Sequence, residues 1–277
     1  MSSAPSKLAP LQLLSVVIPA QNEEGCIAST VEHLYVELRL HNLPHEIVVV
    51  DDGSTDGTWG ILESLKAQIP SLKPVQNPAP HGFGRAVSRG LDHMAGDAVV
   101  VMMADESDDC RDVVRYWKKL NEGYECVFGS RFIAGGGVIG YPKIKLFLNR
   151  FANHFISALF RIDLNDTTNA FKAYRKEVID GCRPLIEPHF NISIEIPLKA
   201  IVRGYSWGNH PDYLARPSHR NGQIKNQGNG QPLSFHLLLY LAGKIFQPRR
   251  LSTDSEVGRF SLPQHQLSLS SNYLLLL

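Results

Sequence analysis

The sequence predicts an α/β fold in which a Rossmann-like, mainly parallel sheet carries helices on both faces. Strand-like and helix-like segments alternate from residue 14 to about residue 132, a pattern typical of βαβ units with right-handed crossovers. The strand-like segments are largely apolar runs, as expected for parallel strands that are buried on both faces. Polar residues follow these strands directly, and open α/β sheets bind ligands at the carboxyl ends of their strands.

The elements follow one another in a regular order. The predicted strands are residues 14–19, 46–50, 73–76, 98–103 and 126–128, and the predicted helices between them are residues 26–39, 58–68, 83–94 and 111–121. The first strand stops at a proline and an Asn-Glu-Glu cluster, and the second runs into two adjacent carboxylates and a Gly-Ser-Thr-Asp turn. Small residues open the third helix, acids follow the fourth strand, and a Gly-Ser-Arg sequence follows the fifth.

The pattern changes after residue 132. A glycine-rich loop (134–140) precedes an amphipathic helix predicted over residues 143–161, which carries the cations Lys143, Lys145, Arg150 and Arg161. Residues 165–175 are β-like at their end, and residues 191–203 are predicted to form a helix. We expect a disordered N-terminus (1–13), one domain (14–250) whose ligand-binding part is residues 14–132 and whose second part is residues 133–250, and a poorly ordered tail (251–277).

The composition limits the classes of partner and the cellular compartment that we expect for this protein. A formal net charge of +1 provides no basic field for nucleic acid, so we expect no nucleic-acid partner. The four cysteines are scattered, and we expect reduced thiols in a cytoplasmic setting. We expect neither a secretory signal nor a membrane span, because no apolar run approaches the ~20 residues that a span needs. Residues 233–246 are either a docked core helix or a helix in the membrane interface, and composition leaves both alternatives open.

Polar residues are concentrated at the first two strand ends. The first set is Pro19, Gln21, Asn22 and Glu23, and the second is Asp51, Asp52, Gly53 and Ser54. Each set alone has a structural explanation, since asparagine and early acids favour the start of a helix. Together, at adjacent strand ends, they predict a ligand site, and the paired acids suit a base or ribose better than a bare phosphate.

These motifs resemble those of the family 2 nucleotide-sugar glycosyltransferases, and the resemblance covers about residues 14–250. It implies a GT-A fold, a nucleotide pocket lined by both sets, and a base or ribose held by Asp51 or Asp52. The family pattern GxGxAxxxGxxxAxGD is matched by Gly82, Gly84, Ala86, Gly90, Ala95, Gly96 and Asp97, with one residue of slack. A dinucleotide fingerprint fits less well because its third glycine is missing. We expect Gly82, Gly84 and Arg85 to bring a helix N-terminus close to a ligand.

The end of the fourth strand carries the predicted metal site. The resembled enzymes have an Asp-x-Asp triplet here, which binds a divalent cation against the donor diphosphate. This chain has Met103-Ala104-Asp105, so Asp105 takes the second acid and the first is absent. We expect Mg²⁺ or Mn²⁺ at Asp105, with Ser107 and Glu106 as candidate helpers, because these hard cations accept carboxylate, phosphate and water oxygens together. A solvated acidic turn is the structural alternative.

The resemblance places the acceptor side beyond the fifth strand. Arg131 is expected to contact a phosphate bidentately. The other acceptor candidates are Asn149, Arg150, Asn153, Asp166 and Thr168, which resemble segments of dolichyl-phosphate mannosyltransferase-like enzymes. Glu195 lies where the family also has an acid. Arg216, Arg220 and Lys225 are candidates for a loop that closes on the donor, although they are out of register with the family motif.

The expected function is transfer of a sugar, with inversion, from a GDP- or UDP-linked donor to a polyprenyl phosphate. A phosphate acceptor is already ionised near neutral pH, so the reaction needs no strong base. Two alternatives remain open: transfer to a saccharide hydroxyl, and a nucleotide-binding subunit without catalysis. A lipid acceptor together with basic and apolar helical segments predicts peripheral association with the cytoplasmic face of a membrane.

Overall fold

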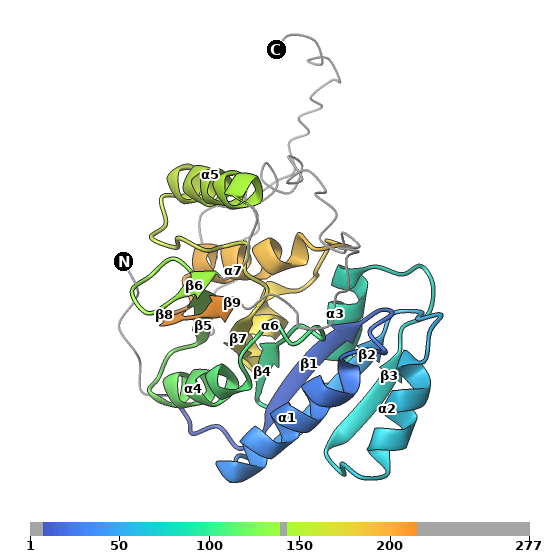
Figure 1. Cartoon of the computed structure of the whole chain (residues 1–277). Coiled ribbons are helices and arrows are strands. Elements are labelled where there is room, and N and C mark those ends of the chain that lie inside the picture. The colour runs from blue at the N-terminus through green and yellow to red at the C-terminus, as the bar shows by residue number, and fades with distance from the viewer. Residues whose placement is uncertain (1–7, 139–142, 215–277) are drawn as a thin grey trace, which may run out of the picture. The chain divides into compact units, whose positions relative to one another are not determined.

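The computed structural model of the chain describes residues 8–138 and 143–214 (Figure 1). Its main feature is a seven-stranded sheet with the order β3-β2-β1-β4-β7-β5-β8. The strands are β1 (Leu14–Ala20), β2 (His45–Asp51), β3 (Leu72–Gln76), β4 (Ala98–Val101), β5 (Cys126–Ser130), β7 (Lys172–Arg175) and β8 (Trp207–Pro211). A separate pair, β6 (Gly137–Val138) and β9 (Tyr213–Leu214), forms a two-stranded sheet.

Strand β7 is the one antiparallel member of the seven-stranded sheet. It lies between β4 and β5 and pairs with both, so that Ala173 faces Val100 on one side and Val127 on the other. The remaining pairs, β1 with β2, β1 with β4, β2 with β3 and β5 with β8, are parallel. The carboxyl ends of six strands therefore share one edge of the sheet, and β7 begins at that edge.

Helices cover both faces of the sheet. The described helices are α1 (Ile27–Leu40), α2 (Thr58–Lys66), α3 (Phe83–His93), α4 (Cys110–Asn121), α5 (Lys143–Phe160), α6 (Lys176–Cys182) and α7 (Ile192–Val202). One apolar core joins α1, α2 and α4 to the sheet, and a second joins α3, α6 and α7 to the opposite face (Figure 1). Strand side chains alternate between these two cores, as the period of a strand requires.

Helix α5 packs on α7 instead of on the sheet (Figure 1). Ile156 and Phe160 of α5 meet Ile194 and Leu198 of α7 in a small separate core. This contact fixes α5 over the part of the sheet edge that follows β5. None of the described helices is long and apolar enough to cross a bilayer.

The predicted strands and helices are all present, with small shifts of their ends. Helix α6, strand β8 and the pair β6–β9 were not predicted. The expectation of disorder over residues 1–13 is wrong for the described part of that segment, because Leu11 is buried in the first core and the Gln12 N–H donates to Asp97 Oδ2 at 2.7 Å. All four cysteines are free thiols. Residues 233–246 and the predicted tail (251–277) lie outside the described residues.

Candidate active site

The first two predicted motifs are joined to each other by hydrogen bonds at the sheet edge. The Asn22 N–H donates to Ser54 Oγ at 2.9 Å, and the Thr55 N–H returns a bond to Asn22 Oδ1 at 2.8 Å. Gln21 Nε2 donates to the Asp52 carbonyl at 2.9 Å. The loops after β1 and β2 therefore form one rigid wall, with Pro19 paired to Val50 beneath it.

The two adjacent acids of this wall have different surroundings. The Asp52 carboxylate accepts from Asn77 Nδ2 at 2.7 Å, the Gly82 N–H at 2.8 Å and His81 Nδ1 at 3.3 Å. The Asp51 carboxylate accepts one long bond, from the Ser54 N–H at 3.4 Å. Both side chains are buried. Asp52 is thus committed to holding the loop after β3, and Asp51 retains the greater capacity to accept from a ligand.

The glycines at the start of α3 approach protein, not a ligand, which corrects the prediction made for them. A Cβ on Gly84 would lie 2.1 Å from the Glu187 carbonyl oxygen, and a Cβ on Gly82 would lie 2.5 Å from that of Pro188. The Pro188 carbonyl accepts from the N–H groups of Gly84 and Arg85 at 3.0 and 3.3 Å. The α3 N-terminus is therefore capped by this loop, and Arg85 bonds the His81 carbonyl at 3.1 Å.

A buried ion pair shapes the loop that caps α3. Glu195 on α7 is fully buried, accepts from the N–H groups of Ile186 and Glu187 at 2.9 Å each, and pairs with Lys199. Lys199 also donates to the Pro184 carbonyl at 2.6 Å. Because its carboxylate is committed to these contacts, Glu195 is a structural acid and not a general base.

The predicted metal position lies in the loop after β4. Asp105 Oδ1 accepts from the Ser107 N–H at 3.2 Å, and the Met103 N–H donates to Asp108 Oδ2 at 2.8 Å. Glu106 has a φ of +59° and accepts from Ser29 Oγ on α1. Within residues 8–138 and 143–214, no three His, Cys, Asp or Glu side chains converge closely enough to hold a metal. A cation here would be anchored by Asp105, and Ala104 is buried beneath it.

Two further acids lie beneath this loop and were not predicted as site residues. Burial and the charge of Asp212 raise the pKa of the Asp108 carboxyl well above its ordinary value. Burial likewise raises the pKa of Asp212 to about 6, although Asn169 Nδ2 donates to its Oδ2 at 2.6 Å. Asp212 follows β8, whose sequence Trp-Gly-Asn-His-Pro lacks the apolar run that revealed the other strands.

The predicted acceptor residues are brought together after β5, and Arg131 is held there by an ion pair. Its Nε and Nη2 donate to the two oxygens of Asp166 at 2.7 and 2.6 Å, and both side chains are buried. One edge of the guanidinium, Nε and Nη2, is therefore engaged by a carboxylate, and the phosphate contact expected of Arg131 stays a prediction. Asp166 holds Arg131 through this pair, and its place on the acceptor side stays a prediction.

Helix α5 supplies the rest of this cluster. Asn149 Nδ2 donates to Thr168 Oγ1 at 2.9 Å, and Asn153 Oδ1 accepts from the Thr167 N–H at 2.7 Å. The guanidinium of Arg150 stacks 4.4 Å from the ring centre of Phe132, with its Nη1 buried and unbonded within the described structure. Arg150 therefore has a buried donor left to offer. Arg216, Arg220 and Lys225 lie outside the described residues.

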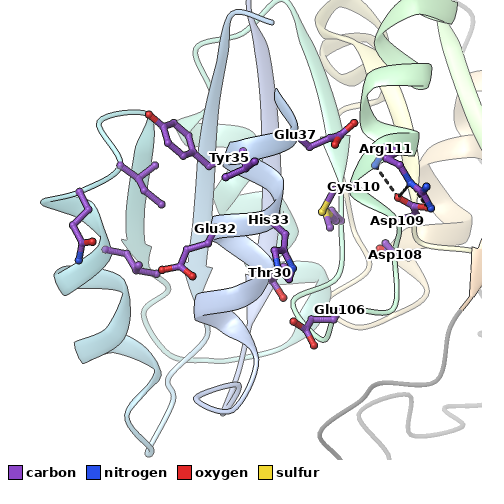
Figure 2. A pocket seen from close by; sticks show the side chains of 15 residues that line it. Thr30, Glu32, His33, Tyr35, Glu37, Glu106, Asp108, Asp109, Cys110 and Arg111 are labelled. Atoms are coloured by element: carbon purple, nitrogen blue, oxygen red, sulfur yellow. Dashed lines mark hydrogen bonds and ion pairs between the residues drawn. The ribbon is translucent and has the colours of Figure 1, made fainter. Parts of the chain in front are cut away.

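A cavity of about 990 Å³ lies apart from these residues, on the outer side of α1 (Figure 2). Its lining comes from α1, the end of α2, the start of α4 and the loop after β4, including His33, Glu37 and Cys110. It borders the candidate site at the loop after β4, where Met102, Glu106 and Asp108 contribute to its lining. None of the predicted nucleotide residues lines it, so we place the site at the sheet edge and not in this cavity.

Comparison with known proteins decides the family. The model of glycosyl transferase family 2 matches residues 15–182. The chain belongs to glycosyl transferase family 2. Its matched region contains both strand-end motifs, Asp105, the Asp166–Arg131 pair and β7. Solved structures agree on the fold. One is glucosyl-3-phosphoglycerate synthase from Mycobacterium tuberculosis, in complex with Mn²⁺, UDP and phosphoglyceric acid. It superposes on this chain with a TM-score of 0.62 at 22% sequence identity, and the match covers 86% of this chain and 80% of the synthase. The fold is the GT-A fold.

Curated relatives in the family are more similar in sequence. A dolichol-phosphate mannosyltransferase from Pyrococcus furiosus is 33% identical over 190 residues, which are 67% of this chain and 52% of the relative. A polyprenol monophosphomannose synthase from Mycolicibacterium smegmatis is 30% identical over 209 residues, 73% of this chain and 77% of the relative. The chain thus spans about half the length of the Pyrococcus relative and most of the Mycolicibacterium one.

Proposed function

We propose that this family 2 member transfers a sugar, with inversion, from a GDP- or UDP-linked donor to a polyprenyl phosphate. The observation that carries the proposal is Arg150, stacked on Phe132 beside the strand-end site with a buried donor unbonded among the described residues. A guanidinium with an unused donor suits a phosphate. The names of the two curated relatives support the same acceptor class.

Different residues of the site bind different parts of the donor. Asp51 accepts from the base or ribose, because Asp52 is already committed to Asn77, His81 and Gly82. A divalent cation supplies charge neutralisation to a departing diphosphate, and Asp105 is the side chain that would hold Mg²⁺ or Mn²⁺. Ser107 supports Asp105 through its N–H. The acceptor phosphate oxygen attacks the anomeric carbon, and the nucleoside diphosphate leaves with the bonding electron pair.

The engagement of two acids near the acceptor cluster is consistent with a phosphate acceptor. Glu195 and Asp166 are both fully buried and engaged in ion pairs within the described structure. A hydroxyl acceptor would need a carboxylate to remove its proton, whereas a phosphate is already ionised near neutral pH. Arg150 and the cluster around it have only to orient that phosphate.

Membrane association is part of the proposal. Helix α5 exposes an apolar stripe: Ile144, Phe147, Leu148 and Phe151 have exposed fractions of 77%, 70%, 58% and 64%, and Phe155 and Leu159 continue it at 45% and 44%. The helix contains no Asp or Glu. An apolar stripe flanked by cations suits the headgroup region of an anionic bilayer. We propose that α5 lies on the cytoplasmic face of the membrane, next to the lipid acceptor.

The test is release of nucleoside diphosphate from GDP- and UDP-sugars, measured with and without polyprenyl phosphate in the presence of Mn²⁺. We expect release to depend on the lipid, and Asp105→Asn to lower it by about a hundredfold or more, the scale of a lost contact to developing charge. Asp109→Asn is the matched control, since Asp109 lies in the same loop but caps α4, a role that asparagine retains. Lipid-independent release, or full activity of Asp105→Asn, would contradict the proposal.

A further inference from the structure

Lys172 is a buried lysine on β7, an interior strand of the sheet. It is the first residue of β7 and faces Val101 of β4 and Phe128 of β5, at the edge where the strand ends of the site gather. Its side chain is 1% exposed. The sequence did not indicate Lys172 as a candidate site residue, because a lysine in a short strand is normally a solvent-exposed surface charge.

The Lys172 ammonium is bound by carbonyl oxygens and not by a carboxylate. Its Nζ donates to the Thr167 carbonyl at 3.0 Å and to the Ser193 carbonyl at 3.3 Å. Among the described residues, no acid lies within ion-pair distance of it. Burying an ammonium without a paired carboxylate is costly, so a lysine that served packing alone would be better replaced by methionine.

The two carbonyls belong to different parts of the acceptor side. Thr167 lies in the turn between Asp166, which holds Arg131, and Thr168, which bonds Asn149 of α5. Ser193 is in the first turn of α7, on which α5 packs. Lys172 is therefore the point at which the sheet, the acceptor turn and α7 are connected through one side chain.

We propose that Lys172 is a positioning residue of the acceptor side, whose ammonium fixes the turn at residues 165–169 against α7 and so sets the place of the acceptor phosphate. The proposal rests on the proposed function for the identity of that acceptor. Lys172 acts through Thr167 and its neighbours and does not touch the reacting atoms.

The protonation state of Lys172 makes the proposed role depend on pH. Burial lowers the pKa of Lys172 to about 7. The positive charge of Arg131 also lowers this pKa, whereas the negative charges of Asp166 and Asp212 raise it. On the packed helix α7, Glu195 and Lys199 pair with each other. The ammonium is thus present below pH 7 and is lost above it, which weakens both carbonyl bonds.

The first test compares Lys172→Met and Lys172→Arg with the exposed-lysine control Lys176→Met on α6. We expect Lys172→Met to raise the KM for polyprenyl phosphate about tenfold, the scale of a hydrogen bond to a charged group, with nucleoside diphosphate affinity unchanged. In the wild type this KM should rise as the pH passes 7, and in Lys172→Arg it should stay flat because arginine remains charged. Equal losses in acceptor KM and nucleotide affinity would overturn the proposal.

A second measurement does not depend on turnover. The N–H groups of Thr167 and Thr168 both donate to Asn153 Oδ1, so loosening of the turn should speed their hydrogen exchange in Lys172→Met while strands β1 and β2 remain protected. Unchanged exchange at these amides would overturn the positioning role even if lipid transfer is confirmed. Faster exchange in a protein that fails to use polyprenyl phosphate would support the role of Lys172 and refute the proposed acceptor.

Discussion

Asp51 and Asp52 show how neighbouring side chains of one motif acquire separate tasks. The peptide between them crosses from the end of β2 into the loop, so that Asp52 turns toward Asn77, His81 and Gly82 and Asp51 does not. The sequence marks both acids as site candidates because both follow an apolar strand. Their division of labour depends on the loop after β3, which no local pattern in residues 51–56 reveals.

This division predicts opposite outcomes for two substitutions. Asp52→Ala leaves three donors without their acceptor, and we expect it to lower the free energy of unfolding by about 2–3 kcal/mol. Asp51→Ala should change stability little and weaken nucleoside diphosphate binding by at least about 1 kcal/mol. Urea denaturation and isothermal titration calorimetry measure the two effects. Loss of nucleotide affinity in Asp52→Ala alone would reverse the assignment.

The glycines of α3 mark the limit of residue-level prediction. A glycine indicates that something approaches the backbone closely, as happens at Gly82 and Gly84, but the ligand expected there is not what the structure places against them. What approaches is the 187–189 loop, more than a hundred residues later in the chain, and nothing in residues 81–86 identifies it. Arg131 is a parallel case, since its partner Asp166 is 35 positions away.

Among the helices and strands, the predictable ones are those with a clear apolar pattern. Strands β1, β2 and β4 are buried valine- and isoleucine-rich segments, and α1, α3 and α4 have a distinct buried face. Strand β7, predicted only as a β-like end of residues 165–175, begins with a lysine and ends with an arginine, and the unpredicted β8 contains Gly, Asn, His and Pro. Their strand conformation is imposed by pairing with β5, because tertiary context overrides weak local propensity.

The apolar stripe of α5 leads to a prediction for membrane binding. Replacing Phe147 and Phe151 by serine removes two large exposed side chains from α5, and we expect recovery with anionic liposomes in flotation to fall several-fold. The matched control replaces Val36 and Leu40 on α1, which are 62% and 71% exposed, and should float like the wild type. Higher salt should weaken the association of the wild type. Equal behaviour of the two double variants would argue against α5 as the contacting helix.

At the scale of the whole described structure, the buried charge of Lys172 should make the free energy of unfolding depend on pH. The pKa of Lys172 is lowered from 10.5 to about 7 in the fold, so between these values the unfolded chain binds more protons than the folded one and stability rises with pH. The cost of the buried ammonium is complete below pH 7 and corresponds to roughly 5 kcal/mol at most.

A comparison with Lys172→Met isolates this contribution. We expect the difference in free energy of unfolding between variant and wild type to favour the variant most at pH 6 to 7, and to shift steadily toward the wild type as the pH approaches 10.5. Urea denaturation over this pH range measures it. A difference independent of pH would mean that Lys172 keeps an ordinary pKa in the folded protein.

The position of β7 also affects how this sheet folds while the chain is being synthesised. Strands β4 and β5 share no hydrogen bonds with each other, since β7 separates them. The facing edges of β4 and β5 therefore stay unpaired in a nascent chain until residue 175 has left the ribosome. At about 5–20 residues per second, the stretch from Ser130 to Arg175 takes roughly 2–9 s to make. Unpaired edges recruit other chains, so a fragment ending at residue 165 should sediment with aggregates on expression, whereas one ending at residue 214 should remain in the supernatant. The window between these two lengths is where a nascent chain of this protein most needs a chaperone.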